Sequence, residues 1–135
     1  MAKIIPYLNF NGKCREAMTF YHHCFGGELV MQKIAESPMA AKMPSEMGNH
    51  ILQSTLTTDN ITIMGSDMIG DKLIQGNEIT LMAHCQNNTE LMNFFAKLAL
   101  GGTVKTPLHQ SFWGAMYGEL TDKYGINWMF NYSKY

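Results

Sequence analysis

Charge is scarce in this sequence, and neither sign dominates. Only 16% of the residues are charged, and ten Lys plus Arg face eleven Asp plus Glu, which leaves a net charge of −1. A chain without a basic surplus has no electrostatic footprint for a phosphate backbone or an anionic membrane surface. We therefore expect neither nucleic acid nor a membrane as a partner.

Long apolar runs and paired cysteines are also missing. No stretch approaches the ~20 apolar residues that a membrane-spanning helix needs, and the N-terminal MAKIIPYLNF alternates like a strand rather than resembling a signal peptide. The three cysteines, Cys14, Cys24 and Cys85, are an odd number without CxxC spacing. This argues against a disulfide framework and a zinc knuckle. We expect a cytoplasmic protein whose cysteines are reduced core thiols.

What is present is a duplicated pattern in a chain of 135 residues, 46% of them apolar, which suffices for one domain with a core. An apolar run at residues 3–10 precedes apolar residues at three- and four-residue steps, which predict a helix near 13–26. The same order returns about 74 residues later, with a strand-like run at 78–84 and a helix near 87–100. Each predicted helix ends at a pair of glycines.

Three more strand-like segments follow each predicted helix. They are GELVMQKIA, HILQSTLTT and NITIMGS in the first half, and TVKTPLHQ, GAMYGELTD and INWMFNY in the second. Each half therefore reads β-α-β-β-β. The sequence predicts an α+β fold, a single domain of two βαβββ modules spanning about 1–74 and 75–135. The stretch 37–49 is irregular, and we interpret it as a long loop and a candidate lid.

Several strings in this sequence resemble one family. They are PYLNF at 6–10, AMTFYHHCFGGEL at 17–29, His50, MGSD at 64–67 and SFWGAMYGELTDKYGINWMFN at 111–131. Together they are similar to the PhnB-like branch of the vicinal oxygen chelate superfamily, which contains glyoxalases, bleomycin-resistance proteins and dioxygenases. The resemblance implies two βαβββ modules, each a curved sheet around a cup, and a homodimer. Some members carry a demethylubiquinone methyltransferase label, but this sequence has no glycine-rich loop after a strand to hold a nucleoside cofactor.

The resemblance also implies where a divalent metal would be bound in the enzymes of the superfamily. The first-strand ligand position falls at Pro6, its counterpart in the second half at Thr80, and the carboxylate position at Met129, with Met64 as counterpart. None of these side chains supplies the imidazole or carboxylate that a tight site needs. We therefore expect no metal and no other cofactor.

Five residues remain as candidate ligand contacts: His50, Asp67, Gln110, Trp113 and Asn127. His50 opens a predicted strand, and the alternative is a histidine held by structural hydrogen bonds. Asp67 ends another strand, where the alternative is an aspartate that bonds its own turn. Asn127 shares a strand face with Met129, and ligand, water or backbone groups are all candidate partners for its amide.

The sequence thus predicts a protein that binds a small, largely apolar molecule without the superfamily metal. An alternative is an enzyme of the superfamily that uses a relocated metal or a metal-free general base. A third reading is a dimer whose cup is filled by its own methionine and aromatic side chains.

Overall fold

The computed structural model describes residues 2–68, 72–111 and 114–133. Trp113 lies outside these residues. The internal contacts divide the chain into two compact units, Met1–Ile74 and Gln75–Tyr135. Among the described residues, no helix is long and apolar enough to cross a membrane.

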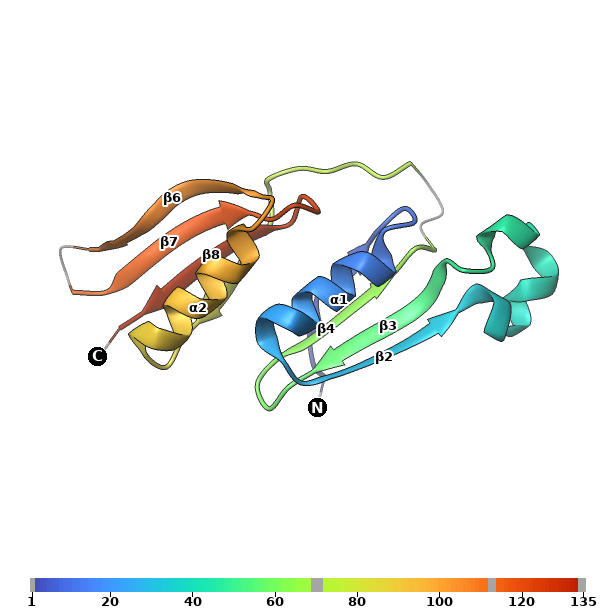
Figure 1. The fold of residues 1–135 in the computed structure, drawn as a ribbon, viewed down its shortest axis with the longest axis horizontal. Helices are drawn as coiled ribbons and strands as arrows, with labels where there is room; N and C mark the ends of the chain where they lie inside the picture. Colours follow the sequence, from blue (N-terminus) through green and yellow to red (C-terminus); the bar gives the residue numbers. More distant parts are fainter. Residues whose placement is uncertain (1, 69–71, 112–113, 134–135) are drawn as a thin grey trace. The chain divides into compact units, whose positions relative to one another are not determined.

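The first unit is one four-stranded sheet with one helix across a face (Figure 1). Its elements are β1 (Tyr7–Asn9), α1 (Cys14–Phe25), β2 (Glu28–Lys33), β3 (Ile51–Thr57) and β4 (Thr62–Ser66). The strand order is β1-β4-β3-β2, in which β1 runs parallel to β4 and the other neighbours are antiparallel. The first unit is thus a βαβββ module.

The second unit repeats this arrangement. Its elements are β5 (Leu81–His84), α2 (Asn88–Ala99), β6 (Thr103–Gln110), β7 (Met116–Thr121) and β8 (Asn127–Tyr132). The order β5-β8-β7-β6, with β5 parallel to β8, matches the order in the first unit. The predicted α+β fold of two βαβββ modules is confirmed, and both helices lie within one residue of their predicted ends.

Each helix buries its apolar stripe against its own sheet. The buried residues of α1 are Cys14, Ala17, Met18, Tyr21 and Cys24, and those of α2 are Leu91, Phe95 and Leu98. Glycines in the sheets make the close approach possible. A Cβ on Gly65 would lie 3.1 Å from the sulfur of Met18, and one on Gly118 would lie 2.8 Å from Cε2 of Phe95. One face of each sheet is therefore covered by its helix, and we call the other face the open face.

The segment between β2 and β3 contains three short 3-10 helices, η1 (Ile34–Glu36), η2 (Pro38–Lys42) and η3 (Ser45–Met47). Ser37 begins η2, because its Oγ accepts a hydrogen bond from the amide of Met39 at 3.2 Å. The segment predicted as a loop at 37–49 is thus a chain of tight turns. Its role as a lid stays a prediction.

Candidate functional site

The open face of the second sheet carries many of the polar side chains of its strands. Phe130 packs edge-on against Phe95 of α2, with ring centroids 5.6 Å apart, so its neighbours in β8 point to the open face. Cross-strand pairing then defines three rows on this face. They are His84-Asn131-Tyr117-His109, then Met82-Met129-Glu119-Thr106, then Asn127-Thr121-Thr103.

The carboxylate of Glu119 is the only acidic group in these rows. One of its oxygens accepts a hydrogen bond from the hydroxyl of Tyr117 at 2.5 Å, and the other accepts one from the hydroxyl of Thr106 at 3.4 Å. The bond to Glu119, and to a smaller extent burial, raises the pKa of Tyr117 to about 12. Tyr117 therefore stays a neutral donor to the carboxylate over the physiological pH range.

Two imidazoles stand at the ends of the first row, and each is oriented by an acceptor. Nδ1 of His84 lies 2.8 Å from Oδ1 of Asn131, and Nδ1 of His109 lies 2.9 Å from the carbonyl oxygen of Pro107. A carbonyl oxygen only accepts, so Nδ1 is the donor in both rings, and in the neutral form Nε2 is left as an acceptor. The His109 ring also meets the Tyr117 ring edge-on, at 5.7 Å between centroids.

The third row has its hydrogen bonds satisfied within the protein. The amide nitrogen of Asn127 donates to the carbonyl oxygens of Gly76 and Ile79, at 2.9 and 3.4 Å, and its Oδ1 accepts from the hydroxyl of Thr121 at 2.9 Å. Two backbone carbonyls and a neighbouring hydroxyl are thus the partners of the Asn127 side chain, for which a ligand had also been a candidate partner. Gln110 ends β6 as an exposed residue.

In the first unit, Asp67 ties three parts of the module together. Its Oδ1 accepts from the backbone amides of Gly12 and Cys14 at 2.8 and 3.0 Å, and its Oδ2 accepts from the amide of Ile51 at 2.9 Å. The residue is 5% exposed. Its carboxylate therefore anchors the start of α1 and the start of β3 to the end of β4, which is a structural use of both oxygens.

His50 lies beside this anchor, directly before β3. Its ring approaches Gly12, where an added Cβ would lie 3.5 Å from Cε1 and 3.6 Å from Nε2. Its backbone is bonded on both sides, to Met47 and to Ile34. The Nδ1 atom is buried, and no hydrogen-bond partner for it lies in residues 2–68, 72–111 or 114–133. His50 thus retains one polar atom that no described group satisfies.

The positions at which the superfamily would hold a metal carry no suitable ligands. In the first sheet Tyr7 pairs with Met64, and in the second sheet Met82 pairs with Met129. Since Gly65 faces α1, Met64 and its partner Tyr7 face the opposite side, so the open-face position in the first strand is Tyr7 and not Pro6. By the same pairing, the counterpart in the second strand is Met82, two residues beyond Thr80.

One phenol and three thioethers do not fit a hard divalent cation, which prefers oxygen and imidazole ligands. Within the described parts of the chain, no group of three or more His, Cys, Asp or Glu is placed to hold a metal ion. The cysteines are buried in the core. Burial raises the pKa of the Cys14 and Cys85 thiols to about 11, which makes both poor nucleophiles.

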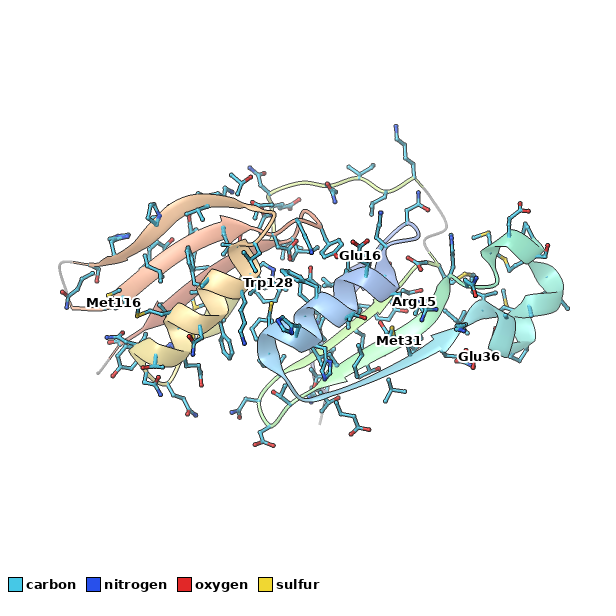
Figure 2. All side chains as sticks on the ribbon, in the orientation of Figure 1. Arg15, Glu16, Met31, Glu36, Met116 and Trp128 are labelled. Carbon is cyan, nitrogen blue, oxygen red and sulfur yellow. The ribbon has the colours of Figure 1, made fainter. Side chains whose placement is uncertain are left out.

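Sequence reasoning did not single out Glu119, Tyr117 or the pairing of His84 with Asn131. One signal was available, because alternation in MYGELT puts Tyr117 and Glu119 on one face of the strand, and a carboxylate in the middle of a half-buried strand is unusual. Their neighbours on other strands depend on register. Figure 2 labels Met116 in β7 and Trp128 in β8, which lie toward opposite ends of the sheet that carries this face.

The family model described as 3-demethylubiquinone-9 3-methyltransferase matches residues 2–130. Protein YjdN of Escherichia coli (strain K12) is 31% identical over 138 residues, which cover 96% of this chain and 94% of that protein. The chain therefore belongs to this PhnB-like family.

Solved structures agree with this assignment. Protein PA1353 from Pseudomonas aeruginosa is 32% identical, with a TM-score of 0.87 over 98% of each chain. The PhnB protein from Bacillus cereus is 26% identical, with a TM-score of 0.79 over 98% of this chain and 100% of the other. A glyoxalase/bleomycin resistance protein/dioxygenase family enzyme from Burkholderia phytofirmans, at 14% identity and a TM-score of 0.58 over 93% and 95%, shares the fold.

Proposed function

We propose that the protein binds a small, largely apolar organic molecule on the open face of the second sheet, without the divalent metal of the superfamily. The observation that carries this proposal is the composition of the middle row. Two methionines, Met82 and Met129, occupy the positions equivalent to metal ligands, and the carboxylate of Glu119 stands beside them. Flexible, polarizable thioethers suit contact with an apolar ligand.

Exposure of these side chains supports the same reading. Met82 is 58% exposed, although a methionine side chain gains free energy from burial. The polar groups around it are already oriented by Asn131, Thr106 and the carbonyl of Pro107. A ligand that covers Met82 and Met129 would meet these oriented groups at its edges, which is the usual composition of a small-molecule site.

The five residues expected from the sequence, His50, Asp67, Gln110, Trp113 and Asn127, have different standing within this proposal. Gln110 ends the strand that carries His109, but it pairs with Met116 and so lies on the opposite face from the first row. Trp113 lies outside the described residues, and contact of either residue with a ligand stays a prediction. His50 belongs to the first unit, and its contact with a ligand is a separate proposal, supported by a buried Nδ1 for which the described residues supply no hydrogen-bond partner. Asp67 and Asn127 would act by holding the backbone, since their side-chain hydrogen bonds are made within the chain.

Nuclear magnetic resonance with isotope-labelled protein tests the proposal. We expect apolar aromatic fragments to shift the backbone amide signals of β5, β7 and β8, and Zn²⁺, Ni²⁺, Mn²⁺ or Fe²⁺ to bind no better than to any histidine-bearing surface. Calorimetric titration with untagged protein measures the metal affinity. A stoichiometric, sub-micromolar metal site, or a fragment screen that leaves the second sheet unshifted, would overturn the proposal.

A second function, metal-free acid–base catalysis, is favoured by the two oriented imidazoles. Because Nδ1 of His84 and His109 donates to a fixed acceptor, Nε2 of each ring is available to take a proton. A bound substrate with an acidic proton near either Nε2 would make that histidine a general base. Turnover of a fragment found in the screen, lost in His84→Gln or His109→Gln, would replace simple binding by catalysis.

We also infer a homodimer in the cytoplasm. On the open face of the first sheet, the cross-strand row Tyr7-Met64-Thr55-Val30 is uncharged, and Tyr7 and Val30 are 46% and 59% exposed. A second copy that covers this row would bury apolar surface. Sedimentation should give about twice the 15.2 kDa of one chain, and a monomer would contradict the inference. The buried free thiols fit a reducing compartment.

A further inference from the structure

Glu119 has acceptor capacity that the described residues leave unused. A carboxylate offers about four lone-pair positions for hydrogen bonds. In the part of the chain that the structure describes, two donors reach it, the hydroxyls of Tyr117 and Thr106, one on each oxygen. The remaining positions are open to a donor that approaches from the open face.

The charge of Glu119 is also uncompensated. In residues 2–68, 72–111 and 114–133, no Lys, Arg or His nitrogen lies within 4.0 Å of its carboxylate oxygens. The three rows around it contain no Lys or Arg. The cation nearest in sequence on the neighbouring strand is Lys105, an exposed residue in an irregular stretch of β6. A negative charge without a cation is complementary to a positively charged ligand.

The groups around Glu119 suit the rest of an organic cation. Met129 lies directly opposite Glu119, and Met82 lies next to Met129 in the same row, so an apolar body would find thioethers beside the carboxylate. The ring of Tyr117 is aromatic surface on which a cation is stabilised. Nε2 of His84 and Nε2 of His109 are two further acceptors on this face. They match an ammonium group, which has three donors and no acceptor.

We propose that the ligand of this face is an organic cation, an amine or ammonium group on an apolar body, whose charged end binds the carboxylate of Glu119. The inference rests on the proposed binding function. An anionic ligand would need cationic donors, and the rows offer it only the amide of Asn131 and hydroxyls, most of which are already engaged.

Three probes with one aromatic body test the charge preference: benzylamine, benzyl alcohol and benzoate. Each is titrated against labelled full-length protein at pH ~8, where a free imidazole is neutral. We expect benzylamine to bind on the order of tenfold more tightly than either other probe. The reason is that a hydrogen bond between an ammonium group and a carboxylate is stronger than one that involves a neutral hydroxyl. The amide signals of Tyr117, Glu119 and Met129 should shift.

Matched variants locate the effect. Glu119→Gln keeps the shape and the acceptor for Tyr117 but removes the charge, so benzylamine should lose about tenfold in affinity while benzyl alcohol keeps its own. Glu28→Gln removes a carboxylate from the open face of the first sheet and should change neither affinity. The amide spectrum of each variant reports that it is folded.

The outcomes separate the two proposals. If benzyl alcohol or benzoate shifts β5, β7 and β8 at an affinity equal to that of benzylamine, the cation inference fails while binding on this face stands. If Glu119→Gln and Glu28→Gln weaken benzylamine equally, the attraction is a general effect of net charge and the inference also fails. If no probe shifts these strands, both proposals fall.

Discussion

Replacement of Asp67 separates a structural anchor from a ligand contact. The carboxylate accepts three backbone hydrogen bonds in a site where the residue is 5% exposed. In Asp67→Asn, the amide oxygen can keep the two donors at Gly12 and Cys14, but the NH₂ group would then point at the amide of Ile51. One hydrogen bond to a charged acceptor is lost, and a buried N–H is left without a partner.

The free energies of these losses can be estimated. A hydrogen bond to a charged group contributes about 1.5–3 kcal/mol, and an unsatisfied buried donor costs about 1–3 kcal/mol. Because the two effects overlap, we expect Asp67→Asn to lower the free energy of unfolding by about 2–4 kcal/mol, and Asp67→Ala by about 3–5 kcal/mol. A whole domain has only about 5–15 kcal/mol of stability, so the alanine variant should be close to unfolding.

Urea denaturation is the assay, followed by circular dichroism for the whole chain and by tryptophan fluorescence for the second unit, which contains both Trp113 and Trp128. Asp59→Asn is the control, because Asp59 is an exposed residue of the turn between β3 and β4. If Asp67→Asn is as stable as Asp59→Asn, the three backbone hydrogen bonds contribute no net stability and the anchor argument is refuted.

Three further predictions concern packing and titration. Gly118→Ala should destabilise by about 1–3 kcal/mol in urea denaturation, because its Cβ would lie 2.7 Å from Cδ2 of a leucine on β6, whereas Gly76→Ala meets nothing within 4 Å and should have little effect. Burial raises the pKa of Cys14 to about 11, so little of the reactive thiolate is present at pH ~8. Iodoacetamide should therefore alkylate Cys14 on the order of 100-fold more slowly in the native than in the unfolded protein. Mass spectrometry of the peptide that contains Cys14 measures the two rates. Tyr117, with a pKa raised to about 12, favours the neutral phenol in the folded state, so its stabilising effect is present below pH ~10 and lost as the pH rises toward 12. Ultraviolet titration should show a late phenol ionisation that moves to lower pH in Glu119→Gln.

The parts of this protein that depend on local sequence could be predicted. Both helices, their glycine ends and the β-α-β-β-β sequence of elements along each half follow from apolar periodicity and turn residues. Register was harder. The metal-ligand position of the first strand was predicted at Pro6 by counting residues from the helix. The pairing of Tyr7 with Met64 instead puts the open-face position one residue later. A shift of one residue reverses the face of a strand.

The contacts that define the candidate site lie beyond such reasoning because they join strands. Glu119 meets Thr106 across β6 and β7, and His84 meets Asn131 across β5 and β8. Two irregularities in the pairing of β6 with β7 bring Thr106 and His109, rather than other residues of β6, opposite Glu119 and Tyr117. No count along the sequence yields these bulges, so the polar face could be found only after the sheet was known.

Each module contains a buried aspartate that holds its turns, after β4 in the first and after β7 in the second, but the open faces of the two sheets differ. Asp122 accepts the amides of Tyr124 and Ile126 and the indole N–H of Trp128 at 2.8 to 3.1 Å, as Asp67 accepts three backbone amides in the first module. A buried carboxylate that holds turns is thus part of the βαβββ framework in both halves. On the middle of the open faces, however, Thr55 in the first sheet stands directly opposite Met64, where the second sheet has Glu119 opposite Met129. Since the strand order is the same in both modules, the difference in chemistry between these two middle rows is attributable to Glu119 and the hydroxyls that orient it.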